Sequence, residues 1–111
     1  MDTFGNRKDQ KTIQLIREAA AAFVQIESNR AALITITGVR LDTKNSKAEI
    51  LFTVMPQEKE PAVLEFLQRK QREFLEYTRA HARIGRNYMY SFAVDFGEHH
   101  RQHIEELMMP K

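Results

Sequence analysis

The sequence has no cysteine, and only four glycines and three prolines in 111 residues. Without cysteine the chain can form no disulfide, thiolate metal site, redox dithiol or cysteine nucleophile. It also lacks the glycine-rich loops that hold phosphates, G-x-x-x-x-G-K-[ST] and G-x-G-x-x-G, and no serine lies in a G-x-S-x-G turn. The acidic residues are scattered, so no pair of carboxylates suggests acid–base catalysis. We expect neither an enzyme nor a protein that binds a cofactor or a small-molecule substrate.

Long hydrophobic runs are absent as well. Uncharged stretches such as 19–26 fall far short of the roughly 20 apolar residues that cross a bilayer. The first ten residues, MDTFGNRKDQ, contain acids and no apolar core, which argues against a signal or transit peptide. Hydrophobic residues make up 42% and charged residues 29% of the chain, an average globular composition. We therefore expect one cytoplasmic domain over 1–111, monomeric when free, with no membrane partner and with flexible ends at 1–8 and 108–111.

The hydrophobic pattern changes its period along the chain and so predicts an order of helices and strands. Apolar residues at three- and four-residue spacing predict a helix over Thr12–Ile26. Alternating β-branched residues then predict a hairpin whose strands run to about Leu41 and to Met55, where Pro56 stops the ladder, and turn formers at Asp42–Ser46 join them. Gly38 interrupts the alternation of the first strand, which predicts a bulge or a twist there.

The second half of the chain predicts a long helix and a third strand. The helix begins at about Pro61, which suits a first helical position, and runs to about Ala82, with Gly85 as its C-cap. Its apolar stripe is interrupted over Arg69–Arg72, which predicts a bend between two helices. Alternation then predicts a third strand, whose core face consists of Tyr88, Tyr90, Phe92, Val94 and Phe96. The segment over 98–108 follows this strand as a short helix or a frayed tail.

This order of elements, α-β-β-α-α-β, predicts an α+β fold. Strands that pair across a helical crossover, with helices on one side, make a two-layer sandwich with a three-stranded sheet and a C-terminal tail. The aromatic stripe of the third strand could instead be a platform that stacks on bases. A sheet of three strands that needs helical cover favours the core.

Positive charge is concentrated in one part of the chain. The formal net charge is only +2, yet residues 69–86 hold six basic residues against Glu73 and Glu76. A local positive field of this kind favours binding to a polyanion such as RNA; the alternative is a solvated helix face paired with the two glutamates. The six basic residues are Arg69, Lys70, Arg72, Arg79, Arg83 and Arg86. Basic residues of the hairpin and the amino-terminal end would extend the RNA-binding surface: Arg40, Lys44, Lys47, Arg7, Lys8 and Lys11.

Three histidines, His99, His100 and His103, lie near the carboxyl end. On a helix His99 and His103 would be four residues apart, a spacing that can bring two imidazoles to one metal ion. A structural zinc site needs further ligands and cysteine is absent, so we expect exposed polar residues and no metal site.

The segment Ala32–Met55, ALITITGVRLDTKNSKAEILFTVM, resembles the first two strands of ribosome-binding factor A. In that family an ITVTGVEL-type strand is followed by a charged turn and an AKVYVTV-type strand. Leu67–Leu75 lies where the family has its second long helix, and Ala93–Asp95 and Ile104–Leu107 match its last strand and its tail. The resemblance extends over nearly the whole chain and rests on the ordered combination of segments, because no single motif is diagnostic.

This resemblance implies a type II KH-like fold and a non-enzymatic role in the bacterial cytoplasm. Members bind the small ribosomal subunit during its late maturation, contact its RNA during 16S rRNA processing, and act by occupying an rRNA site. Two departures mark a divergent member. The family has a small-x-Gly kink between its helices where this chain has Lys70-Gln71-Arg72, and a proline before the last strand where this chain has Tyr88.

A protein of another class, a protein-interaction module that resembles the BolA family, is the alternative. That family pairs with glutaredoxin-type partners and can use a histidine near the carboxyl end, which the histidine cluster would favour. The arginine-rich segment favours the RNA-binding interpretation.

Overall fold

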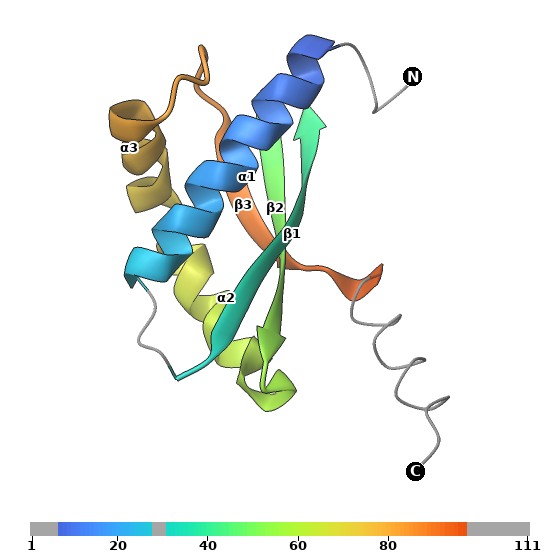
Figure 1. The fold of residues 1–111 in the computed structure, drawn as a ribbon, viewed down its shortest axis with the longest axis vertical. Helices are drawn as coiled ribbons and strands as arrows, with labels where there is room; N and C mark the ends of the chain where they lie inside the picture. The colour runs from blue at the N-terminus through green and yellow to red at the C-terminus, as the bar shows by residue number, and fades with distance from the viewer. Residues whose placement is uncertain (1–6, 28–30, 98–111) are drawn as a thin grey trace.

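The computed structural model describes residues 7–27 and 31–97 (Figure 1). The predicted tail over 98–108, its histidines and the outermost ends of the chain lie outside the described residues. The helices are α1 (Arg7–Glu27), α2 (Glu60–Arg69) and α3 (Gln71–His81), with a short 3-10 helix, η1 (Gln57–Lys59), before α2. The strands are β1 (Leu33–Asp42), β2 (Lys47–Met55) and β3 (Met89–Val94). The order is the one that the hydrophobic pattern predicts.

The three strands form one mixed sheet in the order β1-β2-β3. β1 and β2 are antiparallel, as expected of a hairpin, whereas β3 returns parallel to β2 after the helical crossover. The register of β1 on β2 shifts between Ile36 and Gly38, which confirms the predicted bulge. Because the bulge adds one residue, Val39 and Leu41 face the same layer as Ile36 despite the break in alternation.

The helices cover one face of this sheet, and the core lies between the two layers. α1 runs diagonally across the strands, and α2 and α3 follow one another beside it as a bent pair (Figure 1). The sheet contributes the alternate residues Ile50 and Phe52 of β2, both fully buried, and α1 contributes Ile16 and Ala20 at helical spacing. The α+β two-layer fold expected from the sequence is therefore confirmed.

Aromatic side chains fill the centre of the core. The Phe74 ring of α3 is fully buried, and its centroid lies 5.2 Å from that of Phe23, 4.8 Å from that of Tyr90 and 5.6 Å from that of Phe92. The three contacts are edge-to-face, the arrangement that aromatic quadrupoles favour. Burial raises the pKa of the Tyr90 hydroxyl above 10.0, and hydrogen bonding with Thr78 offsets part of that rise. The aromatic stripe of β3 thus belongs to the core rather than to a stacking platform.

The interrupted apolar stripe of the long helix produces a break at Lys70. This residue has φ −98° and ψ 8°, ends α2 and begins α3. Its backbone N–H donates to the carbonyl of Leu67, while its own carbonyl accepts from the N–H of Phe74. The predicted bend between two helices is therefore present, although neither a glycine nor a small residue lies at this point.

Two sequence expectations at the end of the helical region are wrong. Gly85 is not the C-cap of α3; the helix ends at His81, and Ala82 already has an extended backbone. The early exit lets Ala82 and Ile84 both pack against the core, and Gly85 lies in the loop beyond with φ 92°. Phe96 does not line the core but is 69% exposed, because β3 ends at Val94 and the chain leaves the sheet there.

Candidate nucleic-acid interface

Four exposed arginines lie on the helical region and just after its end: Arg69, Arg72, Arg79 and Arg83, here called the arginine row. Arg72 and Arg79 are seven residues apart on α3, which puts them on one side of the helix and about 10 Å apart along its axis. Phe74 and Thr78 face the opposite way, into the core. Within residues 7–27 and 31–97 none of the four guanidinium groups forms an ion pair, so their positive charge is available to a ligand.

Two arginines of the row have neighbours that limit where they can point. Arg79 Nε donates a hydrogen bond to Oδ1 of Asn87 at 3.3 Å, which links the end of α3 to the loop before β3. Arg83 lines a shallow hollow between α1 and α3, together with Leu15 and Tyr77. Glu76 lies exposed between Arg72 and Arg79 and lowers the local positive potential without pairing with either in the part of the chain that the structure describes.

The loop between α3 and β3 is tied to the hairpin turn by Arg86. Its guanidinium donates from Nη2 to the carbonyl of Thr43 at 3.0 Å and to the hydroxyl of Ser46, and it lies 5.0 Å from the centroid of the Tyr88 ring. The sequence groups Arg86 with the RNA-binding residues, but these contacts give it a structural task. The loop, the hairpin turn and the first turn of α1 all lie at one end of the molecule (Figure 1).

Asp42 shapes the hairpin turn that carries Lys44. Its carboxylate accepts from the backbone N–H of Asn45 at 3.1 Å and from the Asn45 amide at 2.9 Å. The side-chain hydrogen bond from Asn45, followed by the backbone one, lowers the pKa of Asp42 below 3.8. Lys44 is exposed on this turn. The Asp42 carboxylate, and not a glycine, therefore stabilises the turn that positions Lys44 at this end of the molecule.

The lowered pKa of Asp42 predicts how the stability of the turn depends on pH. A carboxylate with a folded-state pKa below its unfolded value stabilises the fold above pH 3.8, and this contribution disappears as pH falls through the folded value. We expect Asp42→Ala to lower the midpoint of urea unfolding at pH 7 and to match the parent in strong acid. Urea titrations of both proteins at several pH values measure this difference in midpoint. A difference that stayed constant down to the most acidic conditions would contradict the stabilising role of the Asp42 carboxylate.

Arg40 and Lys47 lie on the other face of the sheet, away from the arginine row. Arg40 pairs with Glu49 across the β1–β2 ladder, Nη1 to Oε1 at 3.4 Å. Lys47 is the register partner of Asp42, whose pKa it helps to lower. These two cations are thus partly neutralised and separated from α3 by the thickness of the sheet. The structure does not bring the twelve predicted residues onto one surface.

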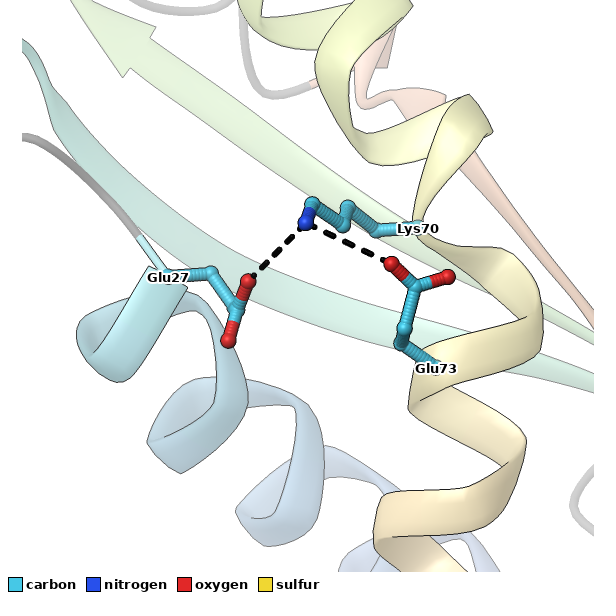
Figure 2. Close-up of polar contacts among 3 residues, drawn as sticks. All are labelled: Glu27, Lys70 and Glu73. Carbon is cyan, nitrogen blue, oxygen red and sulfur yellow. Dashed lines mark ion pairs between the residues drawn. The ribbon is translucent and has the colours of Figure 1, made fainter.

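Lys70 is also engaged within the protein (Figure 2). Its Nζ lies 3.3 Å from Oε1 of Glu27 at the end of α1 and 3.3 Å from Oε2 of Glu73 on α3. The Phe66 ring centroid is 5.5 Å from the same atom. The Glu27 carboxylate, and then that of Glu73, raises the pKa of Lys70 above 10.5. Glu73 could be predicted as a partner of the basic segment because it lies three residues from Lys70, whereas Glu27 is distant in the sequence and could not.

The amino-terminal lysines and arginine begin α1. Lys11 is exposed on its second turn, and Arg7 and Lys8 belong to the first turn, at the same end of the molecule as the hairpin turn. Among the described residues no three His, Cys, Asp or Glu side chains come close enough to hold a metal ion. None of the described helices is long and apolar enough to cross a membrane.

An apolar hollow of about 220 Å³ lies where the end of α1, the start of β1 and α2 meet. Ile34, Val63 and Phe66 line it, with Glu27 and Lys59 at its rim. It is smaller than typical ligand pockets, which measure about 300 Å³ or more. This hollow is therefore not the candidate site, which we place on the exposed positive surface.

Two solved structures are similar to this one. The crystal structure of ribosome-binding factor A from Thermus thermophilus matches with a TM-score of 0.65 and 22% sequence identity, covering 77% of this chain and 93% of that one. A solution NMR structure of a Thermotoga maritima protein, a ribosome binding factor A candidate, matches with a TM-score of 0.51 and 20% identity, covering 76% and 79%. No family model and no curated protein matches the sequence. The chain therefore has the fold of ribosome-binding factor A, as the sequence resemblance implies.

Proposed function

We propose that this protein is an assembly factor that binds the RNA of the small ribosomal subunit during late maturation. It acts by occupying and stabilising an rRNA site and not by catalysis, and it works in the cytoplasm, where ribosomes are assembled. The observation that carries the proposal is the arginine row: four guanidiniums that form no ion pair with the described residues, on a fold shared with ribosome-binding factor A of Thermus thermophilus.

The contacts expected of this surface are with the phosphate backbone. Guanidinium groups offer several N–H donors in a planar fork that suits phosphate oxygens, and backbone contacts fix position without reading sequence. Lys11 and Lys44, both exposed, extend the arginine row toward the end of the molecule where α1 begins and the hairpin turns.

The salt dependence of binding tests the proposed contacts directly. If the arginine row, Lys11 and Lys44 together neutralise about six phosphates, the logarithm of affinity falls with the logarithm of salt concentration at a slope of roughly −4 to −5. Fluorescence anisotropy with labelled small-subunit rRNA, titrated at several salt concentrations, measures that slope. Affinity that hardly changes as salt rises would show that charge does not hold the complex together.

The partner itself is identified by sucrose-gradient sedimentation of the untagged protein in cell lysate. We expect co-migration with small subunits at low salt, and small-subunit rRNA in a pull-down. A pull-down that contains a protein partner and no rRNA would instead favour the BolA-like interaction module.

A further inference from the structure

Lys70 lies at a point where a lysine is locally unfavourable. It is the N-cap of α3 and makes no side-chain capping hydrogen bond, although Ser, Thr, Asp and Asn are the residues that cap well. The amino-terminal end of a helix is the positive end of its dipole and disfavours a cation. A lysine at this position therefore depends on carboxylates close to its ammonium group.

Glu27 is an anion at the negative end of the α1 dipole, which is also unfavourable. It is the last residue of that helix, where the dipole is negative, and the last turn contains no basic residue. The Lys70 ammonium, 3.3 Å away, supplies the cation that α1 lacks, and Glu27 brings a second carboxylate to the start of α3, beside that of Glu73. Both side chains are only 29% exposed, so water screens this pair less than it screens a pair on the open surface.

The three groups in Figure 2 come from two helices that are far apart in the sequence. Glu73 is in the first turn of α3, three residues after Lys70, and its carboxylate completes the bridge. The Phe66 ring of α2 borders the same ammonium. Lys70 thus touches the end of α1, the last part of α2 and the start of α3 with one side chain.

We propose that Lys70 is a positioning residue that fixes the break between α2 and α3 by holding it to the end of α1, and that it does not contact RNA phosphate. Arg69 and Arg72, which flank it and are exposed, are the phosphate-contacting residues at the break. That second assignment rests on the proposed RNA-binding function, whereas the structural role of Lys70 does not.

The structural role is tested by a double-substitution cycle on unfolding. We expect Lys70→Met and Glu27→Gln each to lower the urea midpoint, and the double variant to lie no lower than Lys70→Met, because Lys70→Met already removes the Lys70–Glu27 pair that Glu27→Gln breaks. Lys70→Arg should restore most of the loss. Arg72→Met, an exposed neighbour, should leave the midpoint near the parent value. Additive losses, or a Lys70→Met midpoint equal to the parent's, would overturn the proposal.

The dependence on pH gives the same bridge a second readout. A lysine with a folded-state pKa above 10.5 stabilises the fold fully below that pH, and the contribution disappears as pH rises through the folded value. The difference in urea midpoint between the parent and Lys70→Met should therefore disappear in strong alkali. The difference between Lys70→Arg and Lys70→Met should persist, because arginine keeps its charge there. Buried Tyr90 lowers stability in alkali for every variant alike, so only the differences are read. If the parent remained more stable than Lys70→Met in strong alkali, the ion pairs of Lys70 would not be the source of its stabilising effect.

The salt slope of binding separates positioning from phosphate contact. On a short fluorescein-labelled RNA hairpin we expect Lys70→Met to keep the parent's slope even if its affinity falls, while Arg72→Met reduces the magnitude of the slope by about 0.7 to 0.9. A reduction of that size for Lys70→Met would overturn the proposal. Failure of the parent to bind RNA would overturn the proposed function and the assignment of Arg69 and Arg72, while the unfolding cycle would still decide the role of Lys70.

Discussion

Replacing all four residues of the arginine row by glutamate is expected to abolish co-sedimentation of the protein with small subunits. Four phosphate contacts contribute about −3 to the slope of the logarithm of affinity against the logarithm of salt concentration. At 0.1 M salt, loss of these contacts therefore weakens binding about a thousandfold. That factor corresponds to roughly 4 kcal/mol, and repulsion between glutamate and phosphate adds to it. Sucrose gradients and anisotropy titrations of the purified variant measure the effect.

The matched control is a variant that changes net charge equally at four described basic positions outside the arginine row: Arg17, Arg40, Lys47 and Lys59. We expect this variant to retain most of the binding, since the local field of the row and not the total charge attracts the RNA. Thermal unfolding followed by circular dichroism verifies that both variants fold. If the row variant sediments with subunits like the parent, or if both variants lose binding equally, the row is not the interface.

The exposed position of the row makes this substitution informative about function rather than folding. Arg72 and Arg79 point away from the core face of α3, and surface substitutions of this kind usually change stability by about 0.5 kcal/mol or less. Arg79 also bonds Asn87, so a small effect on the loop before β3 is expected from that residue alone. A variant that binds no RNA while keeping its melting temperature would locate the interface.

The hairpin and its bulge could be predicted from sequence because they depend on local patterns. Alternation of apolar residues fixes which face of a strand is buried, and Gly38 interrupts that alternation at the point where the register shifts. The break at Lys70 was predictable for a similar reason, since polar residues interrupt the apolar stripe of the helix there. These features require only neighbours along the chain.

The candidate site was less predictable because charge in the sequence does not reveal partners in space. Lys70 and Arg86 belong to the basic segment, yet one is bound by Glu27 and the other by Thr43 and Ser46. Those partners come near only once α1 crosses the sheet and the hairpin turn meets the loop before β3. A lysine at a helix start, without a cap, is the local signal that could have indicated a distant carboxylate.

Removing the ring at the centre of the core is expected to have the largest effect on stability. Phe74→Ala deletes a fully buried side chain that contacts three aromatic rings, and such truncations cost about 3 to 5 kcal/mol. Domains of this size are stable by about 5 to 15 kcal/mol, so the variant loses a large fraction of its stability, and its melting temperature falls by well over ten degrees.

Phe96→Ala is the matched control, because it removes the same ring from a side chain that is 69% exposed. We expect a loss of about 0.5 kcal/mol or less there, and an intermediate loss for Phe74→Leu, which keeps part of the volume. Since Phe74 anchors the helix that carries Arg72 and Arg79, RNA binding by Phe74→Ala should fall with its folded fraction while the salt slope of the folded protein is kept. Equal melting temperatures for Phe74→Ala and Phe96→Ala would mean that α3 does not pack on the sheet through this ring.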